Sequence, residues 1–103
     1  MYGWIIDTDH VEETAVGITG PALITPDKLK LLQSGKGRKF KMFDDDNELM
    51  YTGRYIESSD TDGTGRLEDL SEDGFGPLDD FGTPNAGCTS IQYLSDAGTW
   101  ETL

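Results

Sequence analysis

Carboxylates are the side chains of this sequence best placed to do chemistry. The chain has 20 Asp and Glu residues against 8 Lys and Arg, which gives a formal net charge of −12 over 103 residues. Thirteen of the acids fall between residues 44 and 80, where only Arg54 and Arg66 oppose them, whereas six of the eight basic residues fall between Lys28 and Lys41. A field of this size and segregation steers a protein toward basic partners and repels a phosphate backbone.

One use of such carboxylates is to imitate nucleic acid, with acids on a rigid surface in place of phosphates. Duplex DNA carries about one charge per 1.7 Å of its axis, so a charge of −12 matches roughly 20 Å, or about six base pairs. The charge therefore predicts an inhibitor of the anti-CRISPR or anti-restriction type, which binds the basic surface of a nucleic-acid-binding protein or nuclease effector. The predicted partner-binding residues are Asp44, Asp45, Asp46, Glu48, Glu57, Asp60, Asp62, Glu68, Asp69, Glu72, Asp73, Asp79 and Asp80.

Acidic surfaces also have a simpler use, because they keep a small domain soluble and monomeric. Under this alternative the chain is a non-enzymatic interaction or assembly protein. Its contact residues would then be aromatic, namely Tyr51, Tyr55, Phe75 and Phe81. Ionic strength separates the two hypotheses, since a nucleic-acid mimic loses affinity steeply as salt rises and an aromatic interface loses little.

A calcium loop is a third interpretation, centred on the run DTDGTGRL at residues 60–67. Asp60, Asp62 and Thr64 supply oxygens at loop positions 1, 3 and 5, with glycine at position 6 and an apolar residue at position 8. The second half of an EF-hand loop is missing, because a serine stands where a bidentate Glu belongs. The pattern supports at most a weak calcium loop, and the alternative is a charged, glycine-rich tether.

Catalysis requires a base, a nucleophile or a metal ion within mutual reach. His10 is the only histidine, and it stands among Asp7, Asp9 and Glu13 in a run typical of a turn, where a surface histidine is the commoner outcome. Cys88 is the only thiol, without a base near it in the sequence, and is predicted to be a buried structural residue. We therefore predict a protein that is not an enzyme and binds no cofactor.

Three stretches of the chain carry a resemblance to known proteins. The opening YGWIIDTDH (2–10), the run PLDDFGTPNAGCTSIQY (77–93) and the closing WETL (100–103) resemble a group of small acidic proteins from bacterial and phage genomes. The resemblance also covers the middle hairpin, leaves a variable insert at about 58–73 and brings no catalytic residues. It implies an accessory protein of a mobile element that acts in a bacterial host cell.

The elements that must position these residues fit a single domain, 1–103, because a chain of this length buries one modest core. One cysteine cannot form an internal disulfide, which favours a reducing compartment. The first residues lack the pattern of a signal peptide or membrane anchor. The cytoplasm is therefore the expected location, and no membrane partner is predicted.

Apolar periodicity predicts an α+β fold, a small antiparallel β-sheet of about four to six strands with one covering helix and a long acidic loop. Strands are expected at about 2–6, 38–42, 49–56, 89–94 and 99–103, with a short one near 16–18. The helix is expected from about Pro26 to Ser34, with Thr25 as its cap and Gly35 at its end. Gly53 interrupts its strand and indicates a bulge or bend of the sheet.

Residues 57–87 do not fit regular structure, because glycine and proline recur through them with acids in between. We predict a mobile acidic loop at 58–76. Residues 77–88 are expected to be ordered, since Leu78 and Phe81 can anchor them to the core.

The basic segment from Lys28 to Lys41 is not expected to bind nucleic acid directly, because the net charge of the chain repels phosphate. Its lysines can instead balance the acids or pair with the acidic side of a second copy. Self-association, for example as a homodimer, is therefore a secondary expectation.

Overall fold

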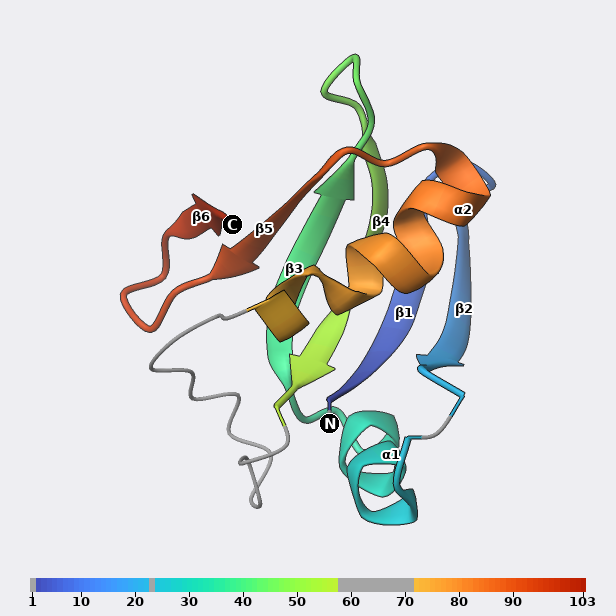
Figure 1. Ribbon diagram of the computed structural model, residues 1–103, viewed down its shortest axis with the longest axis vertical. Helices are drawn as coiled ribbons and strands as arrows, with labels where there is room; N and C mark the ends of the chain where they lie inside the picture. The colour runs from blue at the N-terminus through green and yellow to red at the C-terminus, as the bar shows by residue number, and fades with distance from the viewer. Residues whose placement is uncertain (1, 23, 58–71) are drawn as a thin grey trace.

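The computed structural model describes residues 2–22, 24–57 and 72–103, which form a six-stranded antiparallel sheet with helical segments on both faces (Figure 1). The strands are β1 (Gly3–Asp9), β2 (Thr14–Gly20), β3 (Arg38–Phe43), β4 (Leu49–Ile56), β5 (Ser90–Leu94) and β6 (Trp100–Thr102). Three hairpins lie side by side in the order β2-β1-β4-β3-β5-β6. The predicted α+β fold is confirmed.

The first hairpin is longer than the sequence pattern indicates. β1 continues to Asp9, and β2 spans Thr14–Gly20 where only a short strand was expected near 16–18. Most side chains of β2 are exposed on both faces because the strand lies at the edge of the sheet and pairs with β1 alone. Because neither face of this edge strand is well buried, its sequence does not need to alternate apolar and polar residues. It therefore lacks the period-two pattern that usually indicates a strand.

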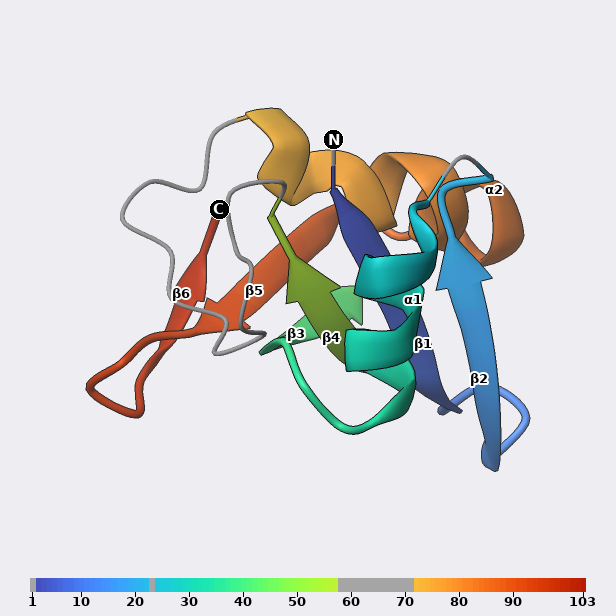
Figure 2. The same cartoon turned by 90° about the horizontal axis from the view of Figure 1, so that it is seen from below.

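α1 (Pro26–Gln33) packs across β1 and β4 on one face of the sheet (Figure 2). The Thr25 hydroxyl accepts a hydrogen bond from the Lys28 backbone N–H at 3.5 Å, and Pro26 occupies the first turn, as predicted. Leu32 is fully buried and forms a small apolar cluster with Ile5 and Ile56. Local capping signals and one apolar contact thus fix the place of this helix.

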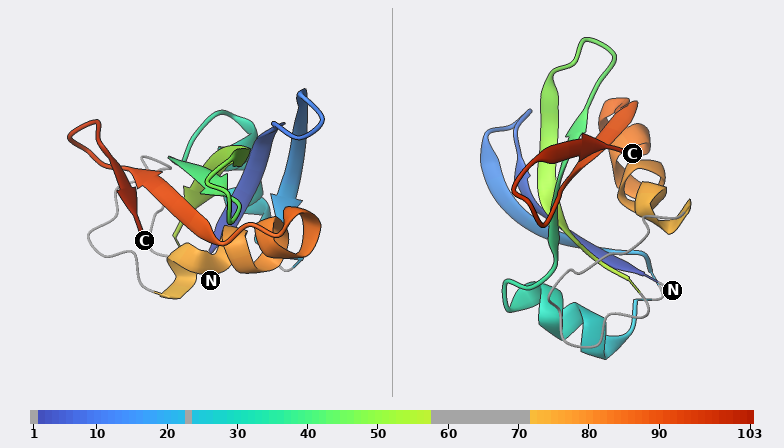
Figure 3. Two further views of the ribbon diagram at one scale, coloured as in Figure 1. Left: turned by 90° about the horizontal axis from the view of Figure 1, so that it is seen from above. Right: turned by 90° about the vertical axis from the view of Figure 1, so that its left-hand side faces the viewer.

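A second helical layer covers the opposite face (Figure 3). It consists of η1 (Glu72–Phe75), η2 (Leu78–Gly82) and the short α2 (Thr83–Ala86), whereas the sequence indicated one covering helix and an ordered but irregular connection. Leu78 is buried, and the Phe81 ring lies 4.9 Å from the Tyr51 ring, so these two anchors are confirmed. Residues 58–71 of the predicted mobile loop lie outside the described residues.

The main core lies between this second layer and the sheet. It contains the buried side chains Trp4, Ile6, Phe40, Met42, Tyr51, Tyr55, Leu78, Cys88, Ile91 and Tyr93. The layer approaches the sheet closely, because a Cβ at Gly76 would overlap the Tyr2 ring. The Tyr93 hydroxyl also donates a hydrogen bond to the Gly74 carbonyl at 2.7 Å. Aromatic packing and a few polar ties therefore hold the layer in place.

Gly53 lies where the register of β1 against β4 shifts, as its interruption of the strand predicted. Ile6 pairs with Gly53 and Thr8 pairs with Thr52, so β1 carries one more residue than β4 at this point. A Cβ at Gly53 would overlap the carbonyl oxygen of Ile5 and clash with the Phe40 ring. Glycine is therefore required for the close approach of β1 and β4.

We expect Gly53→Ala to lower the free energy of unfolding by about 1–3 kcal/mol, because the added methyl group forces β1 and β4 apart. Chemical denaturation followed by circular dichroism measures this change. Asp45→Ala is the matched control, since this exposed side chain makes no contact that should cost more than about 0.5 kcal/mol. An unchanged denaturation midpoint for Gly53→Ala would contradict this close approach of β1 and β4 at Gly53.

Candidate protein-binding surface

Two turns place acids together at one end of the sheet. β1 and β3 flank β4 and run antiparallel to it, so the β1–β2 and β3–β4 turns lie at the same end (upper end of Figure 1). The backbone N–H of His10 donates a hydrogen bond of 2.9 Å to the Met50 carbonyl, which joins the first turn to β4. We call this region the acidic end and define it by Asp9, Glu12, Glu13, Asp44, Asp45, Asp46 and Glu48.

The acidic end is electrostatically uncompensated. Residues 9–13 and 44–48 contain seven carboxylates and no Lys or Arg. Within 2–22, 24–57 and 72–103, the ion pairs join Arg38 to Asp96 and Arg54 to Asp7, and none of them includes a residue of the acidic end. Five of the seven side chains are exposed and the other two, Asp9 and Asp44, are half-buried. A strong negative potential therefore faces solvent here.

Each turn is held by one of its own aspartates. Asp9 Oδ1 accepts hydrogen bonds from the backbone N–H groups of Val11 and Glu12 at 2.9 and 3.1 Å. Asp44 Oδ1 accepts from those of Asp46 and Glu48 at 3.0 and 2.9 Å. Such side-chain to backbone bonds stabilise turns. The carboxylates not used in this way are thus presented from ordered backbone.

The structure gathers only some of the predicted partner-binding residues. Asp44, Asp45, Asp46 and Glu48 share one turn, whereas Glu57 follows the far end of β4, which at about 3.4 Å per residue is roughly 27 Å away. Asp73, Asp79 and Asp80 belong to the second helical layer, which Glu72 begins. Asp60, Asp62, Glu68 and Asp69 lie outside the described residues, as does Thr64 of the predicted calcium loop.

Asp80 has a structural role. Its Oδ2 accepts hydrogen bonds from the Tyr2 hydroxyl at 2.7 Å and from Trp4 Nε1 at 3.1 Å, which ties the second layer to the start of β1. Burial and the hydrogen bond to Asp80 raise the pKa of Tyr2 well above its ordinary value. This carboxylate is therefore already engaged and is not among those free to meet a partner.

Sequence reasoning missed the contribution of the β1–β2 turn. It grouped Asp7, Asp9, His10 and Glu13 as the one His–carboxylate cluster, but the structure sets Asp7 apart from the other three. Asp7 points to Arg54 on the sheet, while the others lie in or beside the turn, where His10 Nε2 is 3.2 Å from Thr52 Oγ1. The strand order could have revealed this grouping. β1 and β3 run in the same direction, so the acidic turns that follow them lie at the same end of the sheet.

The aromatic alternative loses two of its predicted contact residues. Tyr51 and Tyr55 belong to the core and are buried, so their prediction as surface contacts is wrong. Phe81 is half-buried against Trp4 and Tyr51. Of this set, Phe75 alone is exposed. The period-two pattern of β4 explains the error, because it does not say which face of the strand the second layer covers.

Cys88 is buried, as predicted, with 1% of its surface exposed. Burial, and to a smaller extent the charge of Asp44, raises the pKa of its thiol to about 11. Among the described residues no three His, Cys, Asp or Glu side chains are arranged to hold a metal ion. No helix in that part of the chain is both long and apolar enough to cross a membrane.

We expect native Cys88 to resist alkylation by iodoacetamide at pH 8 and to react once the chain is unfolded, because the reactive thiolate is scarce and shielded in the fold. The pKa is raised on folding, so the stabilising contribution of this thiol is complete below the ordinary value of 9.0 and is lost as pH rises toward about 11. Mass spectrometry of labelled protein checks the reactivity. Fast labelling of the folded chain would show that Cys88 is accessible.

Comparison with protein-family models, with curated proteins and with solved structures found no match for this chain.

Proposed function

We infer that this protein is an inhibitory binding protein that covers a cationic surface of a nucleic-acid-binding partner with its acidic end. One observation carries the inference, namely seven carboxylates on two neighbouring, internally braced turns that themselves contain no Lys or Arg. Carboxylates held in place before binding lose little conformational freedom on contact, which favours affinity. Binding without catalysis is the role that this arrangement supports best.

The size of the acidic end sets the size of the surface that it can cover. Seven charges correspond to roughly 12 Å of duplex DNA, or about three to four base pairs. The acidic end therefore suits a short stretch of a basic groove, a smaller footprint than the whole net charge indicates. The described acids at the far end of β4 and on the second layer are not part of this footprint and contribute to long-range steering instead.

A second function, that of an interaction or assembly protein without mimicry, is supported by β2. This edge strand carries no charged residue between Thr14 and Gly20, and its Val16 and Ile18 side chains are 40% and 44% exposed. Open strand edges of this kind pair readily with other chains. Binding through β2 would persist in high salt and be abolished by Ile18→Lys. Binding through the acidic end would be lost in high salt and would be unaffected by Ile18→Lys.

We expect a neutralised acidic end, made by Glu12→Gln, Asp45→Asn, Asp46→Asn and Glu48→Gln, to weaken capture of the partner at least tenfold. These changes spare Asp9 and Asp44, whose carboxylates brace the turns. The measurement is retention of proteins from bacterial lysate on the immobilised chain, with stepwise elution by salt. A single nucleic-acid-binding protein that is released by moderate salt is the expected result.

The matched control removes four exposed acids elsewhere, by Asp27→Asn, Asp73→Asn, Asp79→Asn and Glu101→Gln. It has the same net charge as the test variant, so it should retain the partner nearly as well as the native chain. Equal loss in both variants would mean that net charge and not the acidic end drives capture. Equal retention in both would contradict the inferred function.

A further inference from the structure

The sheet face that carries α1 is only partly covered and contains a hollow of about 400 Å³. The register places Lys39 opposite Arg54 and Lys41 opposite Thr52, so all four side chains share this face. Trp100, from the edge strand β6, closes one side of the hollow. We call it the open-face hollow and define it by Asp7, Lys39, Lys41, Thr52, Arg54 and Trp100.

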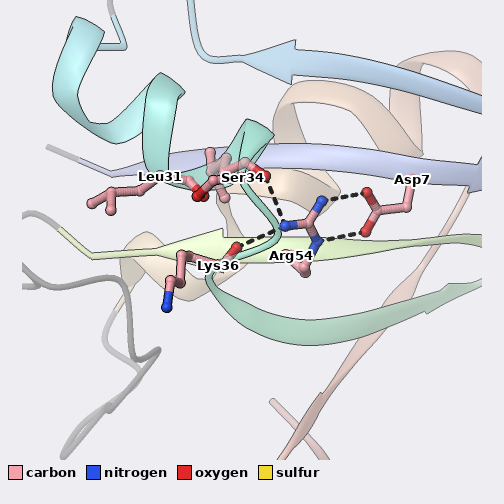
Figure 4. A network of polar contacts seen from close by, with 6 residues as sticks. Asp7, Leu31, Ser34, Lys36 and Arg54 are labelled. Carbon is pink, nitrogen blue, oxygen red and sulfur yellow. Dashed lines mark hydrogen bonds and ion pairs between the residues drawn. The ribbon is translucent and has the colours of Figure 1, made fainter.

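Arg54 and Asp7 neutralise each other within the open-face hollow. The Arg54 guanidinium donates to the two oxygens of Asp7 at 2.9 and 2.7 Å, in a two-pronged ion pair (Figure 4). Its Nη1 donates to the carbonyls of Leu32 and Lys36 at 2.7 and 2.9 Å, which holds the end of α1 against the sheet. Asp7 is thus already paired, and the two lysines set the remaining charge of the hollow.

Lys41 and Lys39 give the open-face hollow a local positive charge. The Lys41 ammonium lies 4.1 Å from the centre of the Trp100 ring, a cation–π contact that orients it. Lys39 is exposed, and within 2–22, 24–57 and 72–103 neither lysine forms an ion pair. Two residues apart on β3, their backbones are roughly 6.8 Å apart on the same face. The hollow is therefore suited to a pair of carboxylates.

We propose that the open-face hollow binds the Asp44–Glu48 turn of a second copy of this chain, with Asp45 and Asp46 paired to Lys39 and Lys41. The turn projects beyond the sheet as a narrow tip (Figure 1). Asp45 and Asp46 are exposed, and their carboxylates take no part in bracing the turn. The hollow has room for two such side chains. Opposite charges, on a projecting turn and in a hollow, thus occur on two surfaces of one molecule.

Two copies that exchange turns satisfy both hollows at once, so a closed dimer is the expected species. Each partner then contributes two carboxylates and two ammonium groups to the contact. This self-association goes beyond the inferred function, because Lys39 and Lys41 are not part of the acidic end. It also occupies the β3–β4 turn, so dimer formation competes with capture of a basic partner.

The dimer should respond to salt in an unusual way. At low ionic strength the two net charges of −12 repel each other over long range. At about 0.15 M salt the screening length is about 8 Å, so long-range repulsion fades while contacts between paired charges persist. At 1 M salt the contact pairs are screened as well. Dimerisation is therefore expected to be strongest at intermediate salt.

Sedimentation velocity with exchanged charges tests the proposal. At 0.15 M salt the native chain should form dimers as its concentration rises. Asp45→Lys/Asp46→Lys and Lys39→Glu/Lys41→Glu should each weaken the dimer at least tenfold, because each places like charges in contact. An equimolar mixture of the two variants should recover the dimer, since every turn then meets a hollow of opposite charge. Recovery also shows that both variants are folded.

Two control variants make the same charge changes elsewhere. Asp27→Lys/Asp79→Lys and Lys28→Glu/Lys30→Glu should leave the dimer within about threefold of the native chain. A native chain that stays monomeric at every concentration and salt would overturn the proposal. So would variants that dimerise alone, or a mixture that fails to dimerise. Lys39→Glu/Lys41→Glu leaves the acidic end intact. This variant should therefore lose the dimer and still capture the basic partner, so failure of the dimer proposal can be told apart from failure of the inferred function.

Discussion

Burial of one aromatic cluster between the sheet and the second helical layer holds this chain together against its own charge. The rings of Tyr55 and Tyr93 meet at 5.6 Å, and that of Phe40 lies 5.9 Å from Tyr93. Such rings bury large apolar areas and add specific edge-to-face contacts. No disulfide assists them, because the chain has a single cysteine. The second helical layer must therefore pack closely against the sheet. Gly76 allows this by packing against the Tyr2 ring, and Asp80 accepts hydrogen bonds from Tyr2 and Trp4.

The same constraint determines where the charges lie. Strands that pack a core on one face and α1 on part of the other have few positions for acids, so the acids concentrate in turns. Antiparallel pairing then brings two of these turns to one end of the sheet, while the lysines of β3 point to its open face. The fold thus separates a negative end from a positive hollow within one small molecule. Both proposals about function follow from this separation, and both concern binding between proteins.

Local signals in the sequence predicted the parts of the fold that local interactions determine. Thr25 and Pro26 marked the start of α1 because capping involves only neighbouring residues. Leu78 and Phe81 indicated an ordered segment, since apolar residues among acids and glycines need a core to contact. The edge strand β2 was largely missed, because exposure on both faces leaves no period. The acidic end could not be assembled from sequence, since it depends on which strands pair and in which direction. Burial of Tyr51 and Tyr55 likewise depends on a layer that comes from the far part of the chain.

The most direct test of the central claim is a map of where a cationic partner contacts the chain. An NMR titration of the labelled protein with a hexalysine peptide at low ionic strength, where the two net charges of −12 oppose dimerisation, reports on each backbone amide. If the acidic end is the dominant anionic surface, the largest shifts should occur together at residues 9–13 and 44–48, with little change at Asp27 or Glu101. Shifts spread evenly over all exposed acids, or centred on another segment, would contradict the claim that these two turns form the binding surface.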